Sequence, residues 1–176
     1  MVEPNLTIAT AVPKGNRGDW LVEKCAELGV RGLWLLRCGR SQVIPGEGKL
    51  ARWRRKGVEA AKQTGHAITM TIEPPRSIDE IISCSSDRTI FYGDPVRSRV
   101  TFGEALADMP ATRTGRNGVL VFIGPEGGFT DAECEEIERA GGRPVRLSHG
   151  ILRVETAAVA TTAIWGCWVA EGHVAD

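Results

Sequence analysis

The sequence predicts an α/β fold, a mostly parallel sheet with helices on both of its faces. Three observations predict it. Short apolar segments such as 119–123 alternate along the chain with amphipathic stretches. Within these segments the apolar residues are continuous, which is typical of strands buried on both faces. Three of the helix starts also carry the same S/T-x-x-E signature, which marks where a strand gives way to a helix.

The order of elements follows from the same signals. The expected strands are 6–12, 33–37, 68–72, 89–92, 119–123 and 144–147. Helices are expected at about 19–28, 49–64 and 155–170, and after the three signatures. Asp19 is expected to cap the first helix, with Gly29 as its C′ residue. Pro74 and Pro75 are expected to close the third strand, and 107–118 reads as a surface loop.

The S/T-x-x-E signatures are capping boxes. They pair Ser77 with Glu80, Thr101 with Glu104 and Thr130 with Glu133. In such a box the hydroxyl accepts from the backbone N–H three residues on, and the carboxylate accepts from the backbone N–H of the cap residue. We therefore expect a helix directly after each of the three.

Composition excludes several classes of protein. A length of 176 residues fits one domain spanning 1–176. Lys+Arg and Asp+Glu are both 22, so a protein that coats nucleic acid by bulk charge is excluded, although a local basic patch is not. The uncharged run 156–170 is shorter than the roughly 20 residues of a spanning helix, so no membrane partner is expected. Five widely spaced cysteines fit reduced thiols in a cytoplasmic protein, and no metal-ligand constellation is visible.

The segment 119–130, VLVFIGPEGGFT, is the strongest ligand signal. A strand ends in a glycine-rich turn and a capped helix follows, and ligands of open α/β sheets bind at the carboxyl ends of strands. The turn matches neither G-x-G-x-x-G nor the P-loop, and Glu126 would repel an anion. A neutral or cationic ligand, such as a sulfonium, fits better. A tight turn without a ligand remains the alternative.

The segment 147–157, LSHGILRVETA, is a second turn of the same kind. Arg153 and Glu155 stand where the chain re-enters a helix. They are candidates for chemistry, although Glu155 alone would also suit the helix dipole and Arg153 alone would also suit a surface position. His149 in this turn is a weaker candidate.

The segment 49–62 holds six basic residues against a single acidic one, Glu59. At least one face of this helix is therefore strongly cationic. Contact with RNA phosphates is the functional interpretation, and a solvated helix face is the alternative. By contrast 126–138 contains six acidic residues and no basic one, so zero net charge conceals a dipolar surface.

Taken together, these segments resemble one family closely, the RsmE-type 16S ribosomal RNA (uracil-N3)-methyltransferases of the SPOUT class. The resemblance spans most of the chain and is carried by KGNRGDWLVEKCAELGV (14–30), Arg40–Ser41, RW…EAAKQTG (52–65), IGPEGGFT (123–130) with Glu133, and LSHGILRVETA (147–157). Gly39 stands where the family's E-R-S element has its Glu.

The resemblance implies a fold, a cofactor and a substrate. The fold would carry a C-terminal deep trefoil knot and form a homodimer. S-adenosylmethionine would lie among the turns after three strands, and the substrate would be N3 of a uridine in 16S ribosomal RNA of the small ribosomal subunit. The implied cofactor-binding residues are Phe91, Tyr92, Gly93, Ile123, Gly124, Pro125, Glu126, Gly127, Gly128, Leu147, Ser148, Ile151, Leu152 and Thr156.

Catalytic and RNA-binding residues are implied in the same way. Arg153 is the first candidate to stabilise the uracilate that forms when N3 loses its proton, and Arg17 is the second, with Glu155 beside them. No general base is identifiable. The residues expected to bind RNA are Arg17, Arg40, Arg52, Arg54, Arg55 and Lys56.

Three departures from the family pattern keep an alternative open. Ser148, Gly150 and Val154 stand where the family has Gly, Arg and Thr. The family also carries an N-terminal PUA-like RNA-binding domain, and this chain begins where that domain would end. The alternative is a non-catalytic knotted dimer that binds RNA or S-adenosylmethionine without turnover. An ordinary doubly wound nucleotide-binding module is a third interpretation, disfavoured because phosphate-loop signatures are absent.

Overall fold

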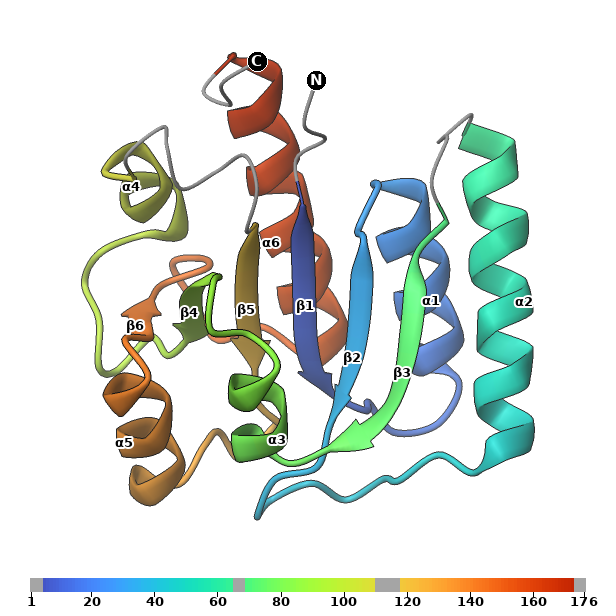
Figure 1. Ribbon diagram of the computed structural model, residues 1–176, viewed down its shortest axis with the longest axis horizontal. Coiled ribbons are helices and arrows are strands. Elements are labelled where there is room, and N and C mark those ends of the chain that lie inside the picture. Colours follow the sequence, from blue (N-terminus) through green and yellow to red (C-terminus); the bar gives the residue numbers. More distant parts are fainter. Residues whose placement is uncertain (1–4, 65–68, 110–117, 173–176) are drawn as a thin grey trace.

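The computed structural model describes residues 5–64, 69–109 and 118–172. They form a six-stranded sheet in the order β3-β2-β1-β5-β4-β6, and every neighbouring pair is parallel (Figure 1). The strands are β1 (Leu6–Ala11), β2 (Gly32–Leu36), β3 (Thr71–Arg76), β4 (Thr89–Gly93), β5 (Val119–Ile123) and β6 (Arg143–Val145). The predicted parallel sheet is confirmed.

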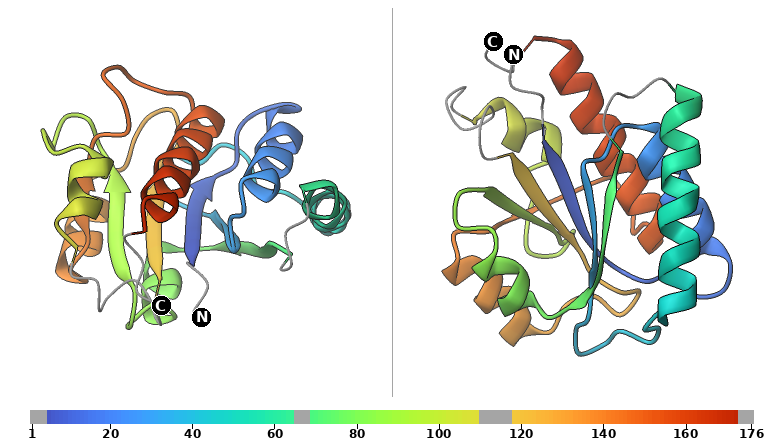
Figure 2. Two further views of the ribbon diagram at one scale, coloured as in Figure 1. Left: turned by 90° about the horizontal axis from the view of Figure 1, so that it is seen from above. Right: turned by 45° about the vertical axis from the view of Figure 1, so that its right-hand side comes forward.

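Helices cover both faces of this sheet, as predicted (Figures 1 and 2). The helices are α1 (Arg17–Glu27), α2 (Glu47–Thr64), α3 (Ile78–Ser83), α4 (Phe102–Ala107), α5 (Asp131–Arg139) and α6 (Val154–Ala170). One face packs against α1, α2, α4 and α6, and the other against α3 and α5. Each face therefore has its own apolar core, which explains why the strands read as continuous apolar runs.

The two central strands, β1 and β5, show this double burial most clearly. All five residues of β5 are buried, and so are all six of β1. Val121 belongs to the core under α1 and α6, whereas its neighbours Leu120 and Phe122 belong to the core under α3 and α5. Successive side chains of a strand point to opposite faces, so a strand covered on both sides must be apolar throughout.

Asp19 does not cap α1, and that prediction is wrong. The helix begins at Arg17, after Asn16 as its N-cap residue. The Asp19 carboxylate faces α2 instead, where it accepts from the Trp53 indole N–H at 2.5 Å and from the Arg52 guanidinium. Gly18 has no Cβ where the Trp53 ring packs, so α1 and α2 approach closely at this point. Asp19 is thus the polar link between the two helices.

The third strand also differs from its prediction. It was expected at 68–72 and to end before Pro74 and Pro75, but β3 runs on through both prolines to Arg76. β3 is the edge strand and pairs with β2 alone, and the register shifts between Trp34 and Leu36 of β2. Proline is tolerated there because an edge strand has a side without ladder hydrogen bonds.

The three capping boxes are confirmed. The backbone N–H groups of Ser77, Thr101 and Thr130 donate to the carboxylates of Glu80, Glu104 and Glu133 at 2.7–2.8 Å. Helices α3, α4 and α5 begin at the next residue in each case. Most of the loop expected at 107–118 lies outside the described residues. The trefoil knot stays a prediction from the resemblance.

Among residues 5–64, 69–109 and 118–172, no helix is long and apolar enough to cross a membrane.

Candidate active site

A cavity of about 410 Å³ lies at the carboxyl ends of β4, β5 and β6. Its walls come from the segments that follow these three strands and from the first turn of α6. The lining residues are Arg40, Gly93, Asp94, Pro95, Val96, Arg97, Ile123, Gly124, Pro125, Glu126, Gly127, Gly128, Phe129, Asp131, Val145, Leu147, Ser148, Gly150, Ile151, Leu152, Val154 and Ala157. This is the edge of an open α/β sheet at which ligands bind.

The segment after β5 forms a wall that is rich in glycine, so its backbone lines the cavity. The N–H of Gly128 donates to the carbonyl of Pro125 at 2.8 Å and closes a tight turn. Gly128 has φ +70°, a left-handed conformation that glycine adopts without strain. Gly124 packs under the ring of Phe129, where a Cβ would lie 3.1 Å from a ring carbon. The glycines expected to bring backbone close to a ligand thus do line the cavity.

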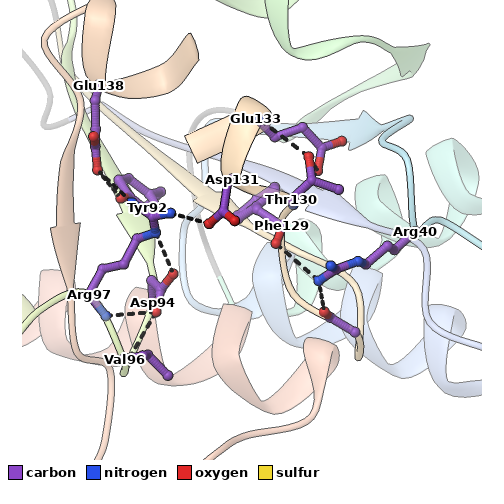
Figure 3. Close-up of polar contacts among 11 residues, drawn as sticks. Arg40, Tyr92, Asp94, Val96, Arg97, Phe129, Thr130, Asp131, Glu133 and Glu138 are labelled. Carbon is purple, nitrogen blue, oxygen red and sulfur yellow. Dashed lines mark hydrogen bonds and ion pairs between the residues drawn. The ribbon is translucent and has the colours of Figure 1, made fainter. Parts of the chain in front are cut away.

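The segment after β4 is tied to this wall by Arg97 (Figure 3). The Asp94 carboxylate accepts from the backbone N–H groups of Val96 and Arg97, at 2.8 and 3.0 Å, and so folds the segment back on itself. The Arg97 guanidinium pairs with Asp131 at the start of α5 and lies 3.9 Å from Glu138. Hydrogen bonding to Asp131 raises the pKa of Arg97. Arg97 therefore joins two walls of the cavity.

Arg40, which follows β2, holds the segment after β5, and its neighbour Gly39 bonds to α5. Arg40 Nη1 donates to the carbonyls of Gly127 and Phe129, at 2.6 and 3.1 Å (Figure 3). The N–H of Gly39 donates to Glu133 Oε1 at 2.7 Å, while Glu133 Oε2 caps α5. A strand two places away in the sheet thus contributes to the cavity.

The segment after β6 is tied at Arg146, whose backbone bonds to Val100 and Phe102 at 2.9 Å, and is held by local contacts beyond that residue. Ser148 Oγ donates to the Gly150 carbonyl at 2.5 Å, and Arg146 donates to the His149 carbonyl at 3.1 Å. Ile151 is 87% exposed although it lines the cavity, and a Cβ on Gly150 would have no atom within 4 Å. This wall is open to solvent.

Arg17 and Glu155, both predicted to be catalytic residues, are in contact. Arg17 Nη1 donates to Glu155 Oε1 at 3.2 Å, and Arg17 Nη2 lies 3.6 Å from Glu126 Oε1. The Glu155 side chain is 7% exposed, and its Oε2 has no hydrogen-bond partner among the described residues. Arg17 therefore connects the cavity residue Glu126 to a buried carboxylate at the start of α6. Arg153, the N-cap residue of α6, is exposed.

Most of the predicted cofactor-binding residues line the cavity. Those that do are Gly93, Ile123, Gly124, Pro125, Glu126, Gly127, Gly128, Leu147, Ser148, Ile151 and Leu152. Phe91 and Tyr92 are instead buried in the two cores, and Thr156 is exposed on α6. Burial raises the pKa of Tyr92, whose hydroxyl donates to Glu138 Oε1 at 2.5 Å. The roles of these three residues stay predictions.

The predicted RNA-binding residues are spread over two places. Arg52, Arg54, Arg55 and Lys56 lie on α2, away from the cavity lining. Three of them have partners within the protein: Arg52 pairs with Asp19, Lys56 pairs with Glu23, and Arg54 donates to the Ile72 carbonyl. Arg55 is exposed. Arg40 lies in the cavity wall.

Several lining residues were not found from the sequence, above all Asp94, Arg97 and Asp131. A signal for the first two was present, because both lie in the segment after the strand 89–92, whose carboxyl end was expected at the ligand edge. Asp131 follows the capping residue Thr130 and reads as a residue that complements the helix dipole. Nothing in the sequence pairs it with Arg97, 34 positions away.

The comparison with protein families decides where the chain belongs. Residues 2–166 match the model of the RNA methyltransferase domain. The chain belongs to this family. The resemblance to RsmE-type enzymes is confirmed by two curated relatives, both called ribosomal RNA small subunit methyltransferase E. The relative from Synechocystis is 30% identical, over 86% of this chain and 50% of its own length. The relative from Mesomycoplasma hyopneumoniae is 28% identical, over 88% and 66%.

A solved structure of an RNA methyltransferase supports the fold. Ribosomal RNA small subunit methyltransferase E from Neisseria gonorrhoeae, bound to S-adenosyl methionine, superposes with a TM-score of 0.77 at 29% identity. The superposition covers 95% of this chain and 66% of that one. This chain spans half to two thirds of the length of the curated relatives named above.

Proposed function

We propose that this RNA methyltransferase domain transfers a methyl group from S-adenosylmethionine to N3 of a uridine in 16S ribosomal RNA. The observation that carries the proposal is the cavity at the carboxyl ends of β4, β5 and β6, with the glycine turn and Glu126 in its wall. Two curated relatives bear the name of a small-subunit ribosomal RNA methyltransferase, and a similar solved structure holds S-adenosyl methionine.

The cavity suits the donor in size and chemistry. Its volume of about 410 Å³ falls within the range of small-molecule sites, which is roughly 300–1,000 Å³. Leu147, Leu152 and Val154 offer apolar contact to a nucleoside, and the glycines allow the backbone to approach it. The Glu126 carboxylate complements a sulfonium cation. S-adenosylmethionine supplies an electrophilic methyl group when bound.

The protein's part in the reaction is electrostatic and geometric. Uracil N3 must lose a weakly acidic proton before it attacks, so negative charge develops on the ring. In this proposal Arg17, held by Glu155 and Glu126, places a guanidinium at the edge of the cavity, and Arg153, two residues before Glu155 at the start of α6, is a second cation. A fixed cation that meets developing charge lowers the barrier, and alignment with the donor lowers it further.

The proposal extends to assembly and location. Residues 1–176 would form a single SPOUT domain with a trefoil knot, acting as a cytoplasmic homodimer on ribosomal RNA of the small subunit. The cations of α2, namely Arg52, Arg54, Arg55 and Lys56, support contact with RNA phosphates because they lie on one helix, and Arg55 among them is exposed.

Methyl transfer to small-subunit RNA tests the proposal. The chain is incubated with labelled S-adenosylmethionine and either intact small subunits or protein-free 16S RNA that lack the modification, and the product nucleoside is identified by mass spectrometry. We expect N3-methyluridine. A folded wild-type chain that yields none would overturn the proposal. If only Gly150→Arg were active, the non-catalytic dimer would hold for the natural sequence.

A further inference from the structure

Arg40 was expected to bind RNA, and its contacts indicate a different role. Its guanidinium is turned toward the protein, where a single nitrogen, Nη1, donates to two backbone carbonyls, those of Gly127 and Phe129 (Figure 3). Both acceptors belong to the glycine turn that lines the cavity. We propose that Arg40 is a positioning residue, which holds the donor-binding turn in shape through its bonds to the backbone carbonyls of that turn. This inference rests on the proposed function for the identity of the ligand.

The turn needs such a residue because it contains two consecutive glycines. Gly127 and Gly128 allow backbone to approach a ligand, but glycine loses more conformational freedom on ordering than any other residue. The peptide between them is planar, so fixing the Gly127 carbonyl also fixes the direction of the Gly128 N–H. Arg40 binds that carbonyl at 2.6 Å, and the Gly128 N–H meets the Pro125 carbonyl at 2.8 Å.

Packing reinforces the hydrogen bonds. The stem of Arg40 lies against Gly127, where an added Cβ would come within 3.2 Å of Arg40 Cδ. A side chain at position 127 and the present place of Arg40 are therefore hard to combine. This gives Gly127 a reason to be glycine that is separate from the ligand, and it links the two residues in a way that an experiment can measure.

The neighbours of Arg40 anchor its backbone. The N–H of Gly39 donates to Glu133 Oε1 at 2.7 Å, and the N–H of Cys38 donates to Ser41 Oγ at 3.1 Å. The segment 38–41 is thus fixed to α5 at one point and folded on itself at another. A binding segment that is already ordered without ligand loses less conformational entropy when the ligand binds. Arg40 would therefore act on donor affinity.

The experiment compares Arg40→Ala with Arg139→Ala, an exposed arginine in the last turn of α5. Calorimetric titration of S-adenosylmethionine is expected to show about tenfold weaker binding for Arg40→Ala and an unchanged affinity for Arg139→Ala. When log RNA affinity is plotted against log salt concentration, Arg40→Ala is expected to give the same slope as the wild type. An arginine that contacted phosphate would instead lower the slope by about 1 and leave donor binding unchanged. That result would overturn the inference.

A double-mutant cycle tests the packing. Gly127→Ala is expected to weaken donor binding about threefold or more in the wild type but to have little further effect in Arg40→Ala, because the clash is then gone. Purely additive effects would contradict a role of Arg40 in holding Gly127, a role that we call the Arg40 clamp.

A readout without the donor separates this inference from the proposed function. Backbone amides of 124–130 are expected to exchange with deuterium faster in Arg40→Ala than in the wild type, while those of α6 stay unchanged. If the wild type failed to bind S-adenosylmethionine but this exchange difference appeared, the proposed function would fail and the clamp would stand. Equal exchange in the two proteins would overturn the clamp.

Discussion

Two of the loops that line the cavity, those after β5 and β6, are held in different ways. The loop after β5 is bound by residues far away in the sequence: Arg40 donates to the Gly127 carbonyl, and Arg17 pairs with Glu126. Arg97 holds the next residues along the chain, through Asp131 at the start of α5.

The loop after β6 is tied to a distant segment at its first residue, where the Arg146 backbone bonds to Val100 and Phe102. Beyond that point its hydrogen bonds span two or three positions, from Ser148 to Gly150 and from Arg146 to His149. The loop after β5 is therefore fixed by distant residues within the turn itself, whereas the loop after β6 is fixed by distant residues at its first position and by local contacts beyond it.

The difference assigns different tasks to the two loops. A wall fixed by distant contacts is organised before a ligand binds, which suits the part of a site that must meet a donor in one geometry. A wall held locally, with Ile151 largely exposed, opens at lower cost. Two of the departures from the family pattern, Ser148 and Gly150, fall in the loop after β6, where a Cβ on Gly150 would have no atom within 4 Å. The third substitution, Val154, is buried at the start of α6.

Arg17 connects the two regions, because it pairs with Glu126 in the loop after β5 and with Glu155 just after the loop that follows β6. Arg17→Ala is expected to lower kcat for methyl transfer about 100-fold, as loss of one stabilising donor does elsewhere. Single-turnover rates at saturating donor measure this. The matched variant Lys14→Ala removes a nearby cation without touching either carboxylate, and an equal loss there would contradict the assignment.

Glu133 makes both a local capping hydrogen bond, with Thr130, and a long-range hydrogen bond, with Gly39. Glu133→Ala removes both the cap of α5 and the acceptor for Gly39, and is expected to lower the free energy of unfolding by about 1–2 kcal/mol. Glu104→Ala removes a capping carboxylate alone. Urea denaturation of the two variants is expected to show the larger loss for Glu133→Ala. Equal losses would mean that the tie to Gly39 adds nothing.

Two glycines probe the backbone of the two loops directly. Gly128 has φ +70°, so Gly128→Ala is expected to cost about 1 kcal/mol of stability. Gly150 has no positive φ and open space around its Cβ position, so Gly150→Ala is expected to stay within about 0.5 kcal/mol. Thermal unfolding of the two variants and the wild type measures the two stability losses. A larger loss at Gly150 would show that the second loop is the more tightly specified one.

The sequence predicted what depends on local pattern and missed what depends on distant pairing. Strand 119–123 and the three capping boxes follow from neighbouring residues and were predicted correctly. Asp19 was misassigned because its partner, Trp53, lies 34 positions away. Arg97 was missed for the same reason, and β3 ran past two prolines because only the sheet order reveals that it lies at an edge.

RNA contact outside both loops gives the smallest expected effect. Arg55→Ala, on the exposed face of α2, is expected to reduce the slope of log RNA affinity against log salt concentration by about 1 and to leave donor affinity unchanged. Filter binding over a range of salt concentrations measures the slope. An unchanged slope would identify this face as a solvated surface.

The most direct test of the central claim is calorimetric titration of S-adenosylmethionine into the purified wild-type chain. The account predicts saturable binding at about one donor or fewer per chain, with a dissociation constant on the order of micromolar, because the wall after β5 is already formed by its long-range contacts. A correctly folded chain that gives no saturable heat and no change in amide exchange at 124–130 would contradict it.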